Sequence, residues 1–84
     1  MVVKQISVFI ENKEGRMKKA INTLAQENIN IRALSIADTT KYGILRLIVS
    51  DNKKAIEALE KDGFIVKEND VIIVAVHFFH FIRE

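Results

Sequence analysis

The sequence predicts an α+β domain with the element order βαββαβ, that is, a four-stranded antiparallel sheet with two helices on one face. Three observations support this fold class. Several short segments alternate apolar and polar residues, as strands do, and two charged segments between them repeat apolar residues at helical spacing. A turn-rich segment, residues 38–43, separates two strand-like runs, as expected for a hairpin.

The first strand is expected over residues 5–10, because Ile6, Val8 and Ile10 occupy every second position. From Gly15 the apolar spacing changes to i, i+3, i+4, i+7 and i+8, which places these residues on one face of a helix. The apolar positions are Met17, Ala20, Ile21, Leu24 and Ala25. The helix should end near residues 26–27, since Asn28 tolerates the left-handed conformation used just past a helix end.

The middle of the chain predicts two strands that lie side by side. Residues 29–37 form an apolar run, and residues 44–50 form another after the turn-rich segment. A hairpin at 38–43 therefore pairs these two strands directly.

The second half repeats the alternation of strand and helix. Ser50 or Asp51 can cap a second helix, and Gly63 supplies its end. The apolar stripe of this helix consists of Ala55, Ile56 and Leu59. These positions indicate a helix that covers the same sheet as the first one.

The last strand is expected over residues 64–66 and 71–76, with an interruption at the polar residues 67–70. Two βαβ halves with right-handed crossovers, joined by a hairpin, form a ferredoxin-like sandwich. In this arrangement the second strand lies at a sheet edge and one sheet face carries no helices.

Both faces of the predicted sheet are apolar. Ile44, Ile48 and Phe9 alternate with the core-facing positions of their strands, so the uncovered face also presents large apolar side chains. A monomer would expose a patch that favours association, and we expect a homodimer or higher assembly, by stacking of sheet faces or by pairing of edge strands. Scattered surface apolar residues of no consequence are the alternative.

Composition restricts the function classes. A chain of 84 residues forms one small domain, and 49% apolar with 29% charged residues is typical of a globular protein. There are 0 cysteines, which excludes disulfides and thiolate sites and agrees with a cytoplasmic location. No apolar run approaches the about 20 residues of a membrane span, and no signal peptide is evident. The net charge of +2 comes from interleaved lysines and glutamates, which does not favour nucleic acid.

The segment between the first strand and the first helix is a candidate anion site. Gly15 lies where the strand becomes a helix, so the first free amides and the helix dipole favour a carboxylate or phosphate there. Asn12 could cap the helix, or its side-chain oxygen could accept a hydrogen bond from an ammonium group.

Residues 7–51, SVFIENKEGRMKKAINTLAQENINIRALSIADTTKYGILRLIVSD, resemble an ACT domain, a small regulatory module that binds amino acids. The similarity is greatest to one half of stand-alone proteins that carry two such domains in tandem. It rests on the loop from Asn12 to Gly15, the pair Asn30 and Ile31, and the runs ALSIADT and YGILRLIV. It extends over residues 2–76, so we expect an ACT-like domain at 1–76 and a divergent apolar tail at 77–84.

The resemblance implies a non-catalytic module that holds an amino acid between domains and uses no cofactor. The loop residues implied are Glu11, Asn12, Lys13, Gly15 and Arg16, and the residues implied on the second strand of a neighbour are Asn30, Ile31 and Ala33. Glu14 stands where family members commonly have proline, and it adds negative charge beside the expected carboxylate. Asn12 is neutral, and an aspartate at this position would attract an ammonium group more strongly.

Other functions remain as alternatives. A purely structural homodimerisation domain needs no ligand. An acylphosphatase-like enzyme would use Arg16 and Asn30, but the loop has one glycine and no catalytic set accompanies it. An RNA-recognition fold shares the element order, yet its base-stacking positions would be aliphatic here. His77 and His80 are spaced like metal ligands without a third ligand, so no metal site is expected.

Overall fold

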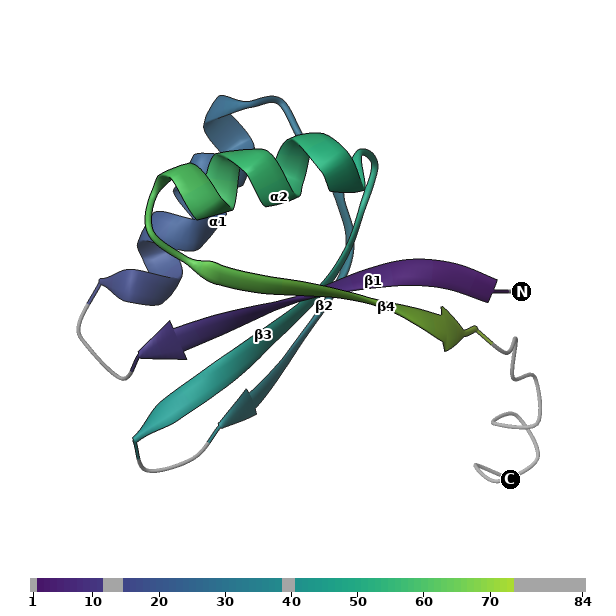
Figure 1. Cartoon of the computed structure of the whole chain (residues 1–84), viewed down its shortest axis with the longest axis horizontal. Coiled ribbons are helices and arrows are strands. Elements are labelled where there is room, and N and C mark those ends of the chain that lie inside the picture. Colours follow the sequence, from purple (N-terminus) through teal and green to yellow (C-terminus); the bar gives the residue numbers. More distant parts are fainter. Residues whose placement is uncertain (1, 12–14, 39–40, 74–84) are drawn as a thin grey trace, which may run out of the picture.

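The computed structural model describes residues 2–11, 15–38 and 41–73, and its elements follow the predicted order. They are β1 (Val2–Glu11), α1 (Arg16–Gln26), β2 (Ile31–Asp38), β3 (Tyr42–Val49), α2 (Asn52–Lys61) and β4 (Ile65–Ile72). Both helices lie on the same side of the twisted sheet (Figure 1). The predicted ferredoxin-like α+β fold is therefore confirmed.

The four strands are arranged in the order β2-β3-β1-β4, and every neighbouring pair is antiparallel. The strand β2 lies at one edge, as predicted, and β4 lies at the other. Because β1 and β2 are both antiparallel to β3, they run in the same direction. The ends of these two strands fix the positions of the expected site residues.

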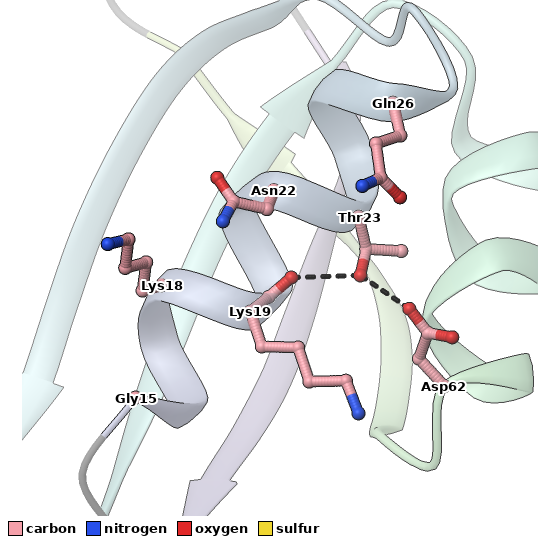
Figure 2. Close-up of a pocket in the computed structure, with 7 residues that line it drawn as sticks. All are labelled: Gly15, Lys18, Lys19, Asn22, Thr23, Gln26 and Asp62. Atoms are coloured by element: carbon pink, nitrogen blue, oxygen red, sulfur yellow. Dashed lines mark hydrogen bonds between the residues drawn. The ribbon is translucent and has the colours of Figure 1, made fainter.

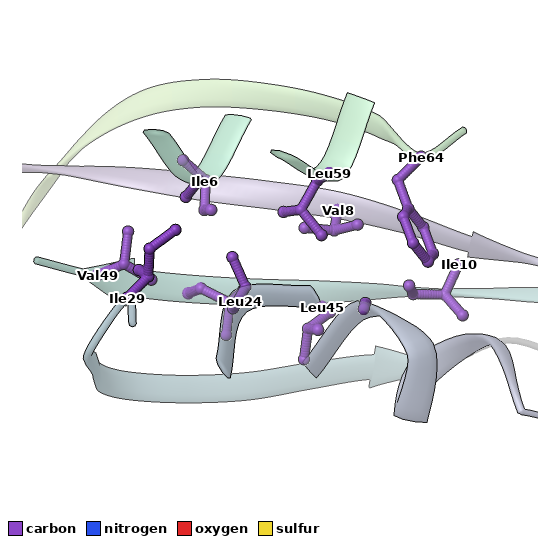
Figure 3. Packing of buried hydrophobic residues seen from close by; sticks show 12 residues of the cluster. Ile6, Val8, Ile10, Leu24, Ile29, Leu45, Val49, Leu59 and Phe64 are labelled. Atoms are coloured by element: carbon purple, nitrogen blue, oxygen red, sulfur yellow. The ribbon is translucent and has the colours of Figure 1, made fainter. Parts of the chain in front are cut away.

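The core lies between the sheet and the two helices (Figure 3). Its members are Ile6, Val8, Ile10, Ala20, Leu24, Ile29, Leu45, Leu47, Val49, Ala55, Leu59 and Phe64. The alternating positions of β1 and β3 supply half of this set, which explains why their period of two was a strong signal. Burying each isoleucine, leucine or valine side chain contributes about 1.5–3 kcal/mol.

The predicted helix ends are confirmed at three positions. The Asp51 side chain accepts a hydrogen bond of 3.1 Å from the Lys54 amide and caps α2. Gly63 has φ 89° and Asn28 has φ 56°, so both are left-handed past a helix end. The strand β2 begins two residues later than predicted, because the Ile29 amide still donates to the Leu24 carbonyl at 3.0 Å.

The predicted interruption of the last strand at 67–70 is wrong. The strand β4 is continuous, with Lys67 opposite Ser7 and Asp70 opposite Lys4. Polar side chains are compatible with an edge strand because water reaches them while the backbone still pairs with β1. The part of the expected strand at 74–76, and the expected tail at 77–84, lie outside the described residues.

The apolar face of α1 also differs from the prediction in one detail. Ala25 is exposed, and Thr23 is buried in its place. The Thr23 hydroxyl lies 2.5 Å from an Asp62 carboxylate oxygen at the end of α2, so the contact between the helices covers this side of α1. Within the described residues, no helix has the length and apolar character needed to cross a membrane.

Candidate functional site

Gly15 is the N-cap residue of α1 and adopts φ 84°, a left-handed conformation that favours glycine. Its carbonyl accepts the first helical hydrogen bond from the Lys19 amide at 2.9 Å. Gly15 itself has no side chain that could cap this end, and the first turn contains no acidic residue, so an anion would meet the helix dipole without a competing carboxylate on the helix. Asn12, the residue that the sequence offers as a side-chain cap, lies outside the described residues together with Lys13.

Arg16 brings a positive charge to the start of the same helix. Its guanidinium carbon lies 4.2 Å from the centroid of the Phe64 ring, and the side chain is half-buried. This stacking fixes the guanidinium plane and leaves N–H groups at its rim that can donate to a carboxylate. Glu11, the last residue of β1, is exposed and pairs with Tyr42.

The second expected group of site residues lies at the entry to β2. The Asn30 amide donates to the Ser50 hydroxyl at 3.0 Å, and the Ser50 amide donates to the Asn30 carbonyl at 2.9 Å. Ile31 packs against the core, while Ala33 is exposed and pairs with Ile48. The register shifts between Ile31 and Ala33, which is a β-bulge that changes the direction of the strand entry.

Within one chain these two groups lie at opposite ends of the sheet (Figure 1). Glu11 is opposite Tyr42 at one end, whereas Ile31 is opposite Val49 at the other. The seven-residue separation along β3 corresponds to about 23 Å at about 3.3 Å per residue. The structure therefore brings Glu11, Gly15 and Arg16 to one corner but does not bring Asn30, Ile31 and Ala33 to that corner.

The edge strand β2 carries exposed apolar residues. Leu34 and Ile36 pair with the core residues Leu47 and Leu45, so they share the helix-side face of the sheet. Their exposed fractions are nevertheless 47% and 49%. The helices cover the centre of the sheet and leave this edge open to a further strand.

A polar groove of about 320 Å³ follows the outer surface of α1 from Gly15 (Figure 2). Its lining residues are Gly15, Lys18, Lys19, Asn22, Thr23, Gln26 and Asp62. At its floor the Thr23 hydroxyl reaches the Lys19 carbonyl at 2.8 Å as well as Asp62. In the sequence, the polar Thr23 beside the apolar stripe of α1 is the signal that could have indicated the groove.

The sequence did not favour a metal site or an acylphosphatase-like catalytic site. Among residues 2–11, 15–38 and 41–73, no group of three or more histidines, aspartates and glutamates is placed to hold a metal ion. His77 and His80 lie outside these ranges. Arg16 and Asn30, the pair that an acylphosphatase-like reaction would use, lie at opposite ends of the sheet within one chain.

Comparison with known proteins finds a family model and several solved structures that are similar to this chain. A family model described as an ACT domain pair matches residues 1–78. Protein BT0572 from Bacteroides thetaiotaomicron has a solved structure that is 51% identical with a TM-score of 0.79, and the match covers 83% of this chain and 49% of that chain. This chain thus spans about half the length of that relative. Among curated proteins, none matches significantly.

Two more distant structures share the fold. The ACT domain of prephenate dehydrogenase from Bacillus anthracis is 24% identical with a TM-score of 0.65, and the match covers 75% of this chain and 99% of that chain. The regulatory subunit of aspartate kinase from Thermus thermophilus is 20% identical with a TM-score of 0.68, covering 82% of this chain and 54% of that chain.

Proposed function

Because the chain belongs to the ACT domain pair family, we propose that it is a non-catalytic regulatory module that binds an amino acid between two copies of itself. The proposal includes a homodimer as the functional unit and the cytoplasm as its location. A regulatory role agrees with the fold that the chain shares with the regulatory subunit of aspartate kinase from Thermus thermophilus.

The separation of the two groups of site residues carries this proposal. The Gly15 corner and the Asn30 entry face opposite ends of one sheet, so a ligand that contacts both needs two copies. Antiparallel pairing of β2 with β2 of a second copy would place the start of one strand beside the end of the other. The Asn30–Ala33 segment of one copy would then approach the Gly15–Arg16 corner of its partner.

The exposed apolar side chains of β2 support the same pairing. Leu34 and Ile36 lie on the free edge, and a second β2 would cover them while its backbone satisfied the unpaired edge groups. Edge pairing also extends the sheet without covering the helices. This favours the edge-strand option over the sheet-face option for the homodimer.

The chemistry of the corner suits an amino acid. The amides after Gly15 and the Arg16 guanidinium provide donors for an α-carboxylate, and the Asn12 side-chain oxygen could accept from the ammonium group. Glu11 borders the corner and adds a negative charge to it, whereas the proposed role of Lys13 rests on the family resemblance. Ile31 and Ala33 of the partner copy would meet the ligand side chain, which favours a small or apolar one.

The test is a thermal-shift titration of the full chain against the twenty amino acids, with the molar mass measured in parallel. A ligand present at a hundredfold excess over its dissociation constant stabilises the native state by about 2.7 kcal/mol, which raises Tm by several degrees. We expect one amino acid, or a few related ones, to respond on a dimer. No responder at millimolar concentration would contradict ligand binding.

A pair of glycine variants locates the site. Gly15 and Gly63 both have positive φ, and a Cβ added at either meets no atom within 4 Å, so the valine substitutions impose a similar backbone strain. We expect Gly15→Val to lose the ligand response and remain dimeric, and Gly63→Val to keep the response. An unchanged affinity in Gly15→Val would remove the corner from the site.

A purely structural homodimerisation domain is the second candidate, because the exposed Leu34 and Ile36 favour association with or without a ligand. Leu34→Arg separates the two functions. The ligand proposal expects the variant to be monomeric and to lose the ligand response. A monomeric variant with the full response would contradict a site between copies, and a dimeric wild type without any responder would support assembly alone.

A further inference from the structure

The sheet face opposite the helices, called here the open face, carries two ordered rows of side chains that run across all four strands. In the first, called the apolar row, Ala37 is opposite Ile44, Ile44 is opposite Phe9, and Phe9 is opposite Ile65. In the second, called the cationic row, Ser35 is opposite Arg46, Arg46 is opposite Ser7, and Ser7 is opposite Lys67. Alternation along each strand places both rows on the same face, one directly beside the other.

The two rows enclose a hollow of about 190 Å³ lined by Ser7, Phe9, Ile44, Ile65 and Lys67. Its walls are mostly apolar, and Ser7 and Lys67 are the polar residues among those that line it. Phe9 is 39% exposed and Ile65 is 67% exposed, so the apolar row remains accessible at this edge of the sheet. A single apolar side chain fits such a volume, and a carboxylate next to it would meet Lys67.

From this arrangement we propose that the open face binds an acidic amphipathic segment of another protein. Apolar side chains of that segment occupy the hollow and cover the apolar row, while its carboxylates pair with Arg46 and Lys67. Apolar contact supplies most of the affinity, and the cationic row determines which partners are accepted. This surface is separate from the β2 edge and from the Gly15 corner, and the proposal does not rest on amino-acid binding.

The charges argue against a second copy of this chain on the open face. If two copies stacked these faces about a twofold axis that runs along the cationic row, Arg46 would face the Arg46 of the second copy, and Lys67 would face its Lys67. The like charges would repel each other. The acidic residues of β4 cannot compensate, because Glu68 and Asp70 pair with Ile6 and Lys4 on the helix-side face. Among the described strand residues, Glu11 is the acidic residue on the open face, and it lies at its border beside Tyr42.

The same face is less suited to single-stranded nucleic acid. Among the residues that the structure describes, the exposed aromatic side chains there are Phe9 and Tyr42, whose ring centroids lie 4.5 Å apart at 33°. Each ring thus already covers part of the other, and the rest of the apolar row is aliphatic. A base-stacking platform would need several free aromatic faces.

The test uses the 15N-labelled full chain and two designed helical peptides of about eighteen residues. The peptides share one leucine face. In the first, glutamates flank this face, and in the second, lysines take their places. We expect the acidic peptide to shift amide resonances in β1, β3 and β4 and to bind more weakly at higher salt, while the basic peptide binds at least tenfold more weakly.

Variants on the open face assign the binding surface. The double change Arg46→Gln and Lys67→Gln should weaken the acidic peptide about tenfold, and Ile65→Ser should weaken both peptides. Lys53→Gln is the matched control, because Lys53 is an exposed cation on α2, and it should change nothing.

Four outcomes would overturn the proposal. They are equal binding of the two peptides, shifts confined to the helices, an unchanged affinity in the double variant, and failure of the acidic peptide to bind at millimolar concentration. Tighter binding of a ten-nucleotide oligouridine through the same resonances would assign the face to nucleic acid instead. Self-association that protects these same amides would assign it to a second copy.

Discussion

The Thr23 hydroxyl oxygen lies 2.5 Å from the Asp62 Oδ2 atom and ties the middle of α1 to the end of α2. The same hydroxyl lies 2.8 Å from the Lys19 carbonyl oxygen, so its single proton is shared between two acceptors. A short hydrogen bond to a carboxylate is stronger than one between neutral groups. This contact sets the spacing of the two helices across the sheet.

Thr23→Val should destabilise the domain by about 1–3 kcal/mol. Valine has the shape of threonine but no hydroxyl, so the half-buried Asp62 carboxylate loses this hydrogen-bond donor. Urea unfolding followed by circular dichroism measures the change. Thr23→Ser is the control, and it should keep most of the stability since it keeps the hydroxyl. An unchanged urea midpoint in Thr23→Val would show that the contact contributes nothing.

Alanine substitutions at two leucines, one in the core and one on the β2 edge, should affect stability in different ways. Leu24 is fully buried in the core, and Leu24→Ala should cost about 2–5 kcal/mol at any protein concentration. Leu34 is 47% exposed on the β2 edge, so Leu34→Ala should leave the monomer's stability nearly unchanged and weaken the dimer. Urea unfolding at several protein concentrations separates the two effects. Equal, concentration-independent losses in both variants would contradict a role of the edge in assembly.

Most of the fold could be predicted because its local signals agree with its packing. The alternation of Ile6, Val8 and Ile10 matches the buried face of β1, and Gly63 and Asn28 end the helices where their backbone freedom is needed. The continuity of β4 could not be predicted in this way. An edge strand draws its stability from backbone pairing, so its side chains at 67–70 carry no apolar pattern.

The candidate site was less accessible to sequence reasoning. The residues of the loop and of the strand entry could be named from the family resemblance, but their separation across the sheet follows from topology and register. The burial of Thr23 depends on where α2 ends, which is a long-range contact that no local pattern encodes. The rows of the open face likewise depend on register, since each row combines four strands.

The ion pair between Lys4 and Asp70 should show little pH dependence near neutrality. Its two atoms are 3.0 Å apart, and the side chains are 62% and 63% exposed, so solvent screens the pair. The hydrogen bond and charge of Asp70 raise the pKa of Lys4 above its ordinary value of 10.5. The stabilisation that accompanies this raised pKa is fully present when the pH is below the pKa of Lys4 in the unfolded chain. It is lost only as the pH rises through the pKa of Lys4 in the folded chain.

Asp70→Asn should therefore lower the urea midpoint slightly in low salt, and the difference should vanish when the pH exceeds the raised pKa of Lys4. Paired urea titrations of the variant and the wild type at pH 7 and at a pH above the raised pKa of Lys4 measure this. Glu57→Gln, on the exposed face of α2, is the control for a general charge effect. A difference that grows at high pH would have the wrong sign for this pair.

The stacking of Arg16 on Phe64 gives the last prediction. Arg16→Lys keeps the charge at the start of α1 but loses the planar contact at 4.2 Å, and it should destabilise the domain by about 0.5–1 kcal/mol. Lys18 is an exposed residue of the same helix, two positions after Arg16, and Lys18→Arg should leave the stability unchanged. Urea unfolding gives both values, and equal stability of the two variants would show that the stacking contributes nothing.

The same Arg16→Lys variant also tests the ligand corner, because the proposed role of Arg16 requires a guanidinium held in a fixed plane. If Arg16 donates to the ligand carboxylate, the increase in Tm caused by the amino acid should become smaller than the loss of stability explains. The reason is that a lysine donates as a flexible point charge. Phe64→Leu provides the comparison, because it loosens the guanidinium without removing it. A full response in Arg16→Lys together with the expected loss of stability would assign Arg16 to the fold alone and leave the Gly15 amides as the carboxylate donors.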